Sequence, residues 1–84
     1  MDLNDARIEI NNIDMEIVRL LEKRFNVVIE IGNYKKENNI PVYDEKREKI
    51  VVKNCISLLE NKSFSSSIED IYKQIMDSSK KLEK

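Results

Sequence analysis

Histidine is absent from this chain of 84 residues, and glycine, proline and cysteine occur only once each. So little turn-forming sequence disfavours a sandwich or barrel of many short strands, and equally a doubly wound fold with a glycine-rich phosphate loop. With one cysteine, Cys55, and no histidine, these residues exclude an intrachain disulfide, a Cys/His zinc site, a thiol-histidine pair and a serine triad. Long helices remain as the expected architecture.

Long apolar runs and an excess of one charge are also missing. No stretch approaches the roughly eighteen consecutive apolar residues of a membrane span, and the acidic start Met1-Asp2-Leu3 is unlike a secretion signal. Fifteen basic and sixteen acidic residues, with the two signs interleaved, give a net charge of -1. We therefore expect a cytoplasmic protein, and its summed electrostatic field should attract neither membranes nor nucleic acid.

The chain does contain a long apolar repeat at helical spacing, which predicts one helix over about residues 4–37. Its members are Leu3, Ala6, Ile10, Ile13, Ile17, Leu20, Arg24, Val27, Ile31 and Tyr34. Such a helix is roughly 50 Å long, whereas a compact monomer of this size is about 30 Å across. Because the overhanging stripe must be covered, we expect a homodimer. Gly32 inside this helix indicates either a close helix crossing or a tolerated glycine.

Two shorter helices are expected after the first. Asn38-Asn39-Ile40-Pro41 should end the first helix, because asparagine favours turns and proline disfavours the α conformation of the residue before it. Asp44 is the expected N-cap of a helix over about 44–60. Ser66 and Glu69 have the spacing of a capping box that opens a third helix over about 66–83. The sequence thus predicts a single all-α domain, residues 1–84, with one long and two shorter helices.

Several polar residues interrupt the apolar stripes. Arg24 lies on the stripe of the first helix, and Arg7 and Lys35 lie beside it. The corresponding residues of the other two helices are Arg47, Glu48, Ser79 and Glu83. A buried cation without a partner costs several kcal/mol, so such positions imply ion pairs or an anionic ligand. A register-setting role for Arg24, and solvation or local capping for the others, are the alternatives to an anion pocket.

These residues also follow the pattern of a known family. The matching segments are Arg7, Ile13-Asp14, Leu20-Leu21-Glu22-Lys23-Arg24, Ile31-Gly32-Asn33-Tyr34-Lys35 and Pro41-Val42-Tyr43-Asp44-Glu45-Lys46-Arg47-Glu48. The spacing of these segments matches the family pattern. It has an early arginine, a second arginine seventeen residues later, a lysine eleven residues beyond that, and then Pro-Val-x-Asp-x-x-Arg-Glu. Over essentially its whole length, the chain resembles the all-helical (all-α) chorismate mutases.

This resemblance implies an intertwined homodimer of three-helix chains that converts chorismate to prephenate in phenylalanine and tyrosine biosynthesis. The reaction is an intramolecular Claisen rearrangement that needs no cofactor and no metal. Since no proton is removed and no covalent intermediate forms, the lack of histidine is consistent with it. The enzyme would clamp the substrate dianion in its reactive geometry and place donors at the ether oxygen, which gains negative charge.

The resemblance assigns the cations to the substrate's negative groups. Arg24 would clamp one carboxylate, and Arg7 would reach the same carboxylate from the partner chain. Guanidinium groups suit this task because they bind carboxylates with two parallel hydrogen bonds. Arg47 would lie near the second carboxylate, and Lys35 would donate to the ether oxygen and a carboxylate.

The remaining predicted contacts involve polar residues of the second and third helices. Glu48 would accept a hydrogen bond from the ring hydroxyl beside Asp44, and Ser79 would contact a carboxylate. Val28, Ile31 and Val51 are the expected apolar walls. The predicted catalytic residues are Arg24, Lys35, Glu48 and Glu83.

Glu83 is a departure from the family pattern, because many members have a glutamine there that donates to the ether oxygen. An amide always donates, whereas a carboxylic acid donates only while it is protonated. We therefore expect kcat/KM to fall as pH rises, and Glu83→Gln to flatten that dependence. Fraying of the chain end, which would leave Glu83 in solvent, is the alternative.

Three other functions are alternatives to a chorismate mutase. An isochorismate-pyruvate lyase would need the same clamp, and its products, salicylate and pyruvate, would distinguish it. A helical dimer without catalysis would be expected to have lost clamp cations, but this chain retains all of them. A helix-turn-helix DNA-binding protein is disfavoured, because residues 37–43 are too long for its tight turn and no basic face emerges.

Overall fold

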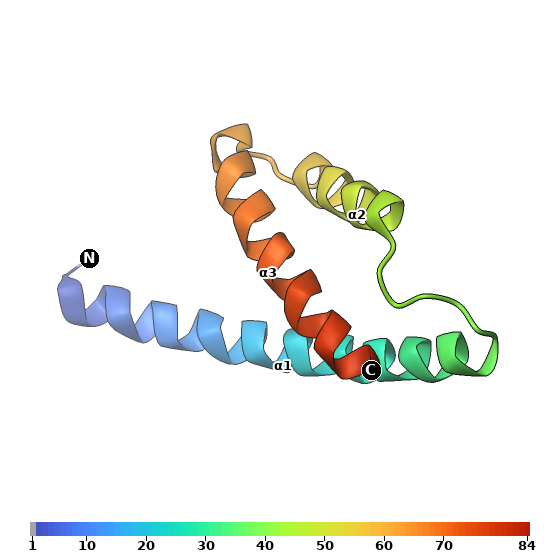
Figure 1. The fold of residues 1–84 in the computed structure, drawn as a ribbon. Helices are drawn as coiled ribbons and strands as arrows, with labels where there is room; N and C mark the ends of the chain where they lie inside the picture. Colours follow the sequence, from blue (N-terminus) through green and yellow to red (C-terminus); the bar gives the residue numbers. More distant parts are fainter. Residues whose placement is uncertain (1) are drawn as a thin grey trace.

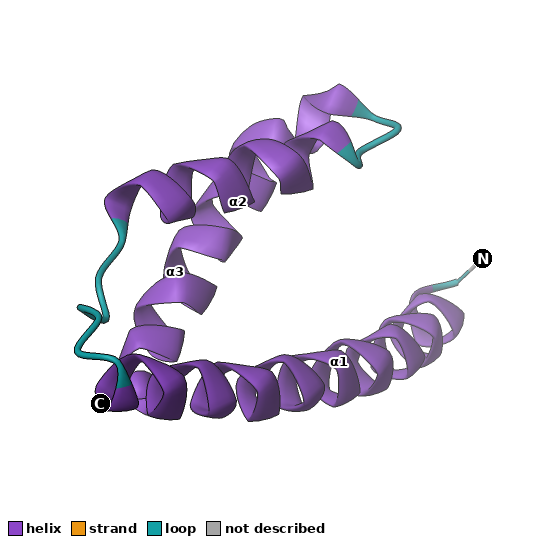
Figure 2. Cartoon of the chain, turned by 90° about the vertical axis from the view of Figure 1, so that its right-hand side faces the viewer, coloured by secondary structure: helices purple, strands orange, loops and turns teal. Residues whose placement is uncertain are grey.

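The computed structural model describes residues 2–84, which form three α-helices and a short 3-10 turn (Figure 1). The helices are α1 (Leu3–Glu37), α2 (Glu45–Ser57) and α3 (Ser65–Glu83), and the 3-10 helix η1 (Lys62–Phe64) directly precedes α3. No strand occurs among the described residues (Figure 2). The predicted all-α fold, with one long and two shorter helices, is confirmed.

Helix α1 has capping groups at both ends. Oδ1 of Asp2 accepts a hydrogen bond from the Asp5 amide at 2.8 Å, which satisfies one of the free donors of the first turn. At the other end Asn38 is the C-cap, and Asn39 adopts a positive φ of 56°. Asparagine tolerates this left-handed conformation better than most residues do. The two asparagines therefore end the helix, and the chain then turns toward α2.

The start of α2 agrees with the sequence, but its end does not. Oδ1 of Asp44 accepts from the Arg47 amide at 3.0 Å, so the predicted N-cap is confirmed. The helix ends at Ser57, earlier than the predicted end near Glu60. Nζ of Lys62 donates to the carbonyl oxygens of Ile56 and Ser57 at 2.9 and 3.1 Å. This ammonium satisfies two carbonyls that a longer helix would have used itself.

The predicted capping box of α3 is wrong. The helix begins at Ser65, one residue before the predicted cap Ser66, and no side chain caps it. The chain enters α3 directly from η1, and Oγ of Ser65 donates to the Lys62 carbonyl at 2.7 Å. Capping is transferred to Asn61, whose Oδ1 accepts from the Ser63 amide at 3.0 Å. The 3-10 turn thus takes the place that the capping box was expected to fill.

Helix α3 packs on both other helices and crosses α1 close to the end of the chain (Figure 1). At the crossing, a Cβ atom added to Gly32 would lie 2.7 Å from Cα and 2.9 Å from the carbonyl oxygen of Glu83. Real side chains do not tolerate such distances to backbone atoms. The close-crossing interpretation of Gly32 is confirmed, and it explains why a residue with poor helix propensity lies inside a long helix.

A single chain buries little apolar surface. Of the apolar side chains described, only Val28 and Met76 are buried, and the molecule measures 53 × 24 × 16 Å. The first half of α1 extends away from α2 and α3 (Figure 1). Large apolar residues exposed along it are Leu3, Ile8, Ile10, Ile13, Met15, Ile17, Val18 and Leu20. No helix among residues 2–84 is both long and apolar enough to cross a bilayer.

Candidate active site

The three helices surround a cavity of about 310 Å³, which is within the size range of small-molecule sites. Apolar walls come from α1, α2 and α3, and the buried side chains Val28 and Met76 line its interior. Seven of the eight predicted site residues also line this cavity: Arg24, Lys35, Asp44, Arg47, Glu48, Ser79 and Glu83. Residues that are up to 59 positions apart in the sequence, Arg24 and Glu83, therefore meet at one place.

Arg24 is held by α3. Its Nη1 donates to Oγ of Ser79 at 3.0 Å, and that hydroxyl donates to the Ile75 carbonyl one turn earlier at 2.7 Å. Ser79 is buried, so its hydroxyl has a fixed direction. The hydrogen bond engages one of the five N–H donors of the guanidinium group, which leaves others for a ligand in the cavity.

Lys35 connects the cavity to both the loop and α3. Its Nζ donates to the Val42 carbonyl at 2.9 Å and forms an ion pair with Oε1 of Glu83 at 2.9 Å. Glu83 is only 7% exposed, so the expectation that it might fray into solvent is not met. The carboxylate reaches Lys35 because Gly32, one turn earlier on α1, lets the α3 backbone come close.

Asp44 and Arg47 lie at the first turn of α2, at the edge of the cavity. Asp44 uses one carboxylate oxygen to cap the helix, and both side chains are exposed. The free amide groups at a helix start carry partial positive charge. This end of the cavity therefore combines the Arg47 guanidinium with the positive end of a helix, and it suits an anionic group of a ligand.

Glu48 is paired with Lys80, which was not among the predicted site residues. Nζ of Lys80 lies 3.0 Å from Oε2 of Glu48 and 3.3 Å from Oδ1 of Asp77. The hydrogen bond to Glu48 is the largest cause that raises the pKa of Lys80 above its usual value, against the opposing effect of desolvation. Helical spacing places Lys80 on the same face of α3 as Met76 and Glu83, but it does not show the pairing with Glu48, which depends on the approach of α2.

Arg7 is the predicted site residue that the chain does not bring to the cavity. It lies exposed on the projecting half of α1. Seventeen residues separate it from Arg24, which corresponds to about 25 Å along a helix. Within a single chain Arg7 and Arg24 therefore cannot contact one ligand of ordinary size.

The cavity as a whole favours an anion. Four cationic and three carboxylate side chains line it, among them Lys80 as the additional cation. Ion pairs engage two of the carboxylates, Glu48 and Glu83, and capping engages Asp44. The Arg24 and Arg47 guanidinium groups are the cations with the most donors left for a ligand. No group of three or more residues of the types His, Cys, Asp and Glu within residues 2–84 is arranged to hold a metal ion.

Tyr72 lies on α3 near Cys55 and Arg24. Burial raises the pKa of its hydroxyl above the usual 10.0, and a hydrogen bond with the Cys55 thiol raises it further. The positive charge of Arg24 acts in the opposite direction. At neutral pH the phenol is therefore uncharged, and it does not compete with a ligand anion for the guanidinium group of Arg24.

Comparison with known proteins identifies the family. The model of chorismate mutase type II matches residues 6–84. The bifunctional chorismate mutase/prephenate dehydratase of Buchnera aphidicola subsp. Schizaphis graminum is 38% identical over 79 residues, which are 93% of this chain and 20% of that protein. The T-protein of Haemophilus influenzae is 31% identical over 75 residues, 88% of this chain and 20% of that protein.

A solved structure is similar over the whole fold. A conserved hypothetical protein from Pyrococcus furiosus superposes with a TM-score of 0.81 at 33% identity, covering 98% of this chain and 95% of that one. By contrast, the chain spans about one fifth of the length of the curated relatives it matches. The family match covers α2, α3, all but the first three residues of α1 and every residue that lines the cavity, and the chain therefore belongs to the chorismate mutase type II family.

Proposed function

We propose that this chain is a chorismate mutase, which rearranges chorismate to prephenate. The observation that carries the proposal is the convergence of Arg24, Lys35 and Arg47 on one cavity with apolar walls. Chorismate carries two carboxylates and an ether oxygen on a small ring. A cavity with cations at separate points and apolar surface between them suits such a dianion.

The two carboxylates would be held at opposite sides of the cavity. Arg24, already oriented by Ser79, clamps one of them, and Arg47 at the start of α2 binds the other. Both contacts fix orientation as well as charge, because guanidinium and carboxylate groups form paired hydrogen bonds. Holding the side chain of the substrate over its ring converts a rare conformer into the bound one, which lowers the entropic part of the barrier.

Lys35 and Glu83 would act at the ether oxygen. In the rearrangement the ether C–O bond breaks while a C–C bond forms, and no proton is transferred. Negative charge grows on the oxygen, and a donor placed there stabilises the transition state more than the substrate. Lys35 supplies that donor, and Glu83 supplies a second one when it is protonated. The pair is already assembled, with 2.9 Å between Nζ and Oε1.

The ring hydroxyl would be bound at the other wall. Glu48 accepts its hydrogen bond, with Asp44 beside it at the start of α2. Val28, Ile31 and Val51 line the same cavity and exclude water around the ring. Ser79 acts on the same carboxylate through the Arg24 guanidinium group that it holds.

The site would be completed by a second copy of the chain. The exposed apolar residues of the projecting half of α1 form the face that a partner chain covers. Arg7 lies on this same half and would enter the partner's cavity to bind the carboxylate held by Arg24. One chain lines its cavity with only one more cation than carboxylates, so a further arginine from the partner brings the excess to two, which matches a dianion.

The experiment is the conversion of chorismate in metal-free buffer by the wild type and by Arg24→Ala, with prephenate measured as product. We expect the substitution to lower kcat/KM roughly a hundredfold, because a bidentate contact to a desolvated carboxylate is lost. Arg19→Ala is the matched control, since Arg19 is an exposed arginine of α1 that does not line the cavity.

Three results would contradict the proposal. A folded wild-type protein that leaves chorismate unchanged would favour a scaffold without catalysis. Salicylate and pyruvate formed from isochorismate, without prephenate from chorismate, would assign the lyase reaction instead. An Arg24→Ala variant as active as the Arg19→Ala control would remove Arg24 from the site.

A further inference from the structure

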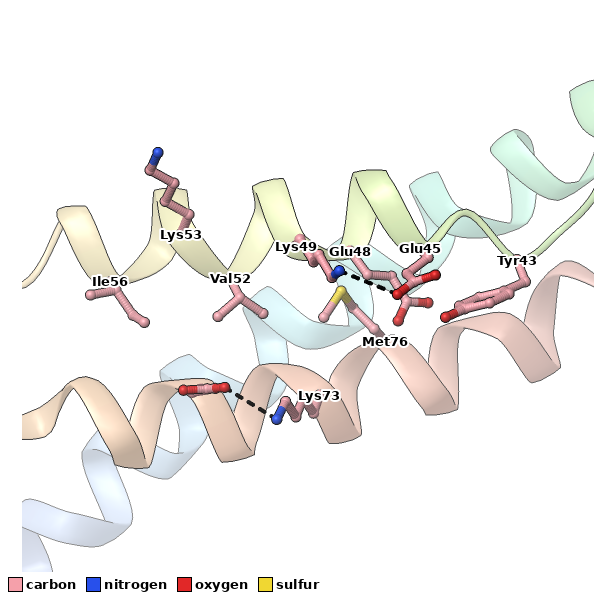
Figure 3. A pocket seen from close by; sticks show the side chains of 10 residues that line it. Tyr43, Glu45, Glu48, Lys49, Val52, Lys53, Ile56, Lys73 and Met76 are labelled. Atoms are coloured by element: carbon pink, nitrogen blue, oxygen red, sulfur yellow. Dashed lines mark ion pairs between the residues drawn. The ribbon is translucent and has the colours of Figure 1, made fainter.

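Glu48 lines more than one cavity. Its side chain lines the candidate active site, and it also lines a more open groove between α2 and α3 with a volume of about 530 Å³. Figure 3 shows this groove, with Glu48 and Tyr43 extending from the α2 side toward α3 and with Met76 below them. The carboxylate therefore has other environments beside the candidate site, and the proposed substrate binds only in the candidate site.

The groove offers Glu48 other cations. Lys49, Lys53 and Lys73 line it, and the first and last of these form ion pairs with Glu45 and Glu69 at 3.3 and 3.1 Å (Figure 3). Both of these pairs are exposed on the surface and are formed within one helix, so they are weak and exchange readily. These lysines are therefore available as alternative partners for Glu48 on the groove side.

Lys80 lines the site cavity and not the groove. It holds Glu48 at 3.0 Å, and both side chains are only 26% exposed. Among residues 2–84 this is the ion pair that joins α2 to α3. The ammonium group is itself fixed from two further directions, by Asp77 at 3.3 Å and by the Tyr43 ring, whose centroid lies 4.6 Å away.

We propose that Lys80 is a positioning residue, which keeps Glu48 turned toward the active site so that its second oxygen can accept the substrate's ring hydroxyl. The proposal rests on the mutase function proposed above. Lys80 binds Oε2, and Oε1 is the oxygen left for the ligand. An acceptor with a fixed direction loses no rotamer entropy when the substrate binds, which is the benefit of preorganisation.

The test compares Lys80→Met in the wild-type and Glu48→Gln backgrounds by steady-state kinetics with chorismate. We expect Lys80→Met to lower kcat/KM about tenfold, because a displaced contact group costs rate even when it is still present. This loss should be divided between kcat and KM in the same way as the loss that Glu48→Gln causes. In the Glu48→Gln background it should have less than about a twofold effect, since there is no carboxylate left to position. Lys80→Arg, which keeps a cation, should restore most of the activity.

A control and a structure complete the experiment. Lys73→Met removes a lysine of the same helix whose partner Glu69 does not line the site cavity, and kcat/KM should stay within about twofold of wild type. A crystal structure of ligand-free Lys80→Met should show Glu48 turned into the groove. Circular dichroism checks that each variant folds.

Different outcomes overturn different proposals. An equal loss on Lys80→Met in both backgrounds would mean that Lys80 acts on the substrate directly, and it would overturn the positioning role. The positioning role would also be overturned if the wild type were active and Lys80→Met were equally active. A Lys80→Met structure in which Glu48 has not moved would overturn it as well. A folded wild type that does not convert chorismate would overturn the mutase function, and with it the role of Lys80 in that reaction.

Discussion

Gly32 and Glu83 meet backbone to backbone where α1 and α3 cross, with room for a hydrogen but not for a methyl group. The contact sets the depth at which the last turn of α3 lies on α1. Glu83 is thereby buried and brought within 2.9 Å of Lys35. A residue without a side chain thus determines where one of the candidate catalytic groups is placed.

Gly32→Ala should lower stability and should lower activity more. Alanine improves helix propensity by about 1 kcal/mol, but the clash is with backbone atoms and costs about 1–3 kcal/mol. The end of α3 can shift to relieve the clash, and this shift separates Glu83 from Lys35. Urea denaturation and kcat/KM measure the two effects. Asn33→Ala, at the exposed neighbouring position, should keep full activity, and a fully active Gly32→Ala would contradict the proposed role of the crossing.

Glu83→Gln should raise kcat/KM, because an amide always donates to the ether oxygen, whereas the Glu83 carboxylate is held in an ion pair by Lys35 at 2.9 Å. Steady-state kinetics with chorismate measures the effect. The exposed loop residue Glu60 provides the control Glu60→Gln, which should leave kcat/KM unchanged. A Glu83→Gln variant no more active than the Glu60→Gln control would remove Glu83 from the ether oxygen.

Mixing two inactive variants should restore activity if Arg7 acts in the partner's site. Arg7→Ala and Arg24→Ala each damage both sites of a homodimer. A mixed dimer contains one site with both arginines, and random exchange of equal amounts should give about a quarter of the wild-type activity. If Arg7 served its own chain, no site of the mixed dimer would be complete, and mixing would restore nothing. Native mass spectrometry, with one of the two variants carrying an isotope label, confirms that the chains have exchanged.

Tyr72 should titrate late and should make the folded state less stable at alkaline pH. Its pKa is raised above 10.0 by burial and by Cys55, so the folded state binds this proton more tightly than the unfolded state does. Below about pH 10 the phenol is neutral in both states, so Tyr72 adds no pH dependence to the stability. Above about pH 10 the unfolded state loses the proton first, so the stability falls with rising pH until the folded-state pKa is passed. Absorbance near 295 nm follows the ionisation. Tyr72→Phe should remove the late phase, whereas Tyr34→Phe, at an exposed position, should keep it.

Features that depend on local spacing could be predicted from the sequence. The length of α1 and the Asp44 cap follow from helical periodicity and from the capping preference of aspartate. Arg24 was noticeable because a cation interrupts an apolar stripe. In each case the relevant neighbours lie within a few turns of the same helix, so one helical wheel contains the information.

Features that depend on contacts between elements could not be predicted in this way. Lys80 resembled an ordinary lysine in the last turn of a helix, where it suits the dipole, and only the approach of α2 shows that it holds Glu48. The early end of α2 depends on Lys62, which folds back from the next turn. The capping box predicted from the spacing of Ser66 and Glu69 does not form, because η1 runs directly into α3.

The sparse interior described for one chain also determines how this protein responds to dilution. With Val28 and Met76 as the buried apolar side chains of the described residues, an isolated chain has too little core to offset its chain entropy. We therefore expect folding and association to be one equilibrium, in which Tm rises with protein concentration. Specific activity should then decline in very dilute assays, as chains separate and unfold together.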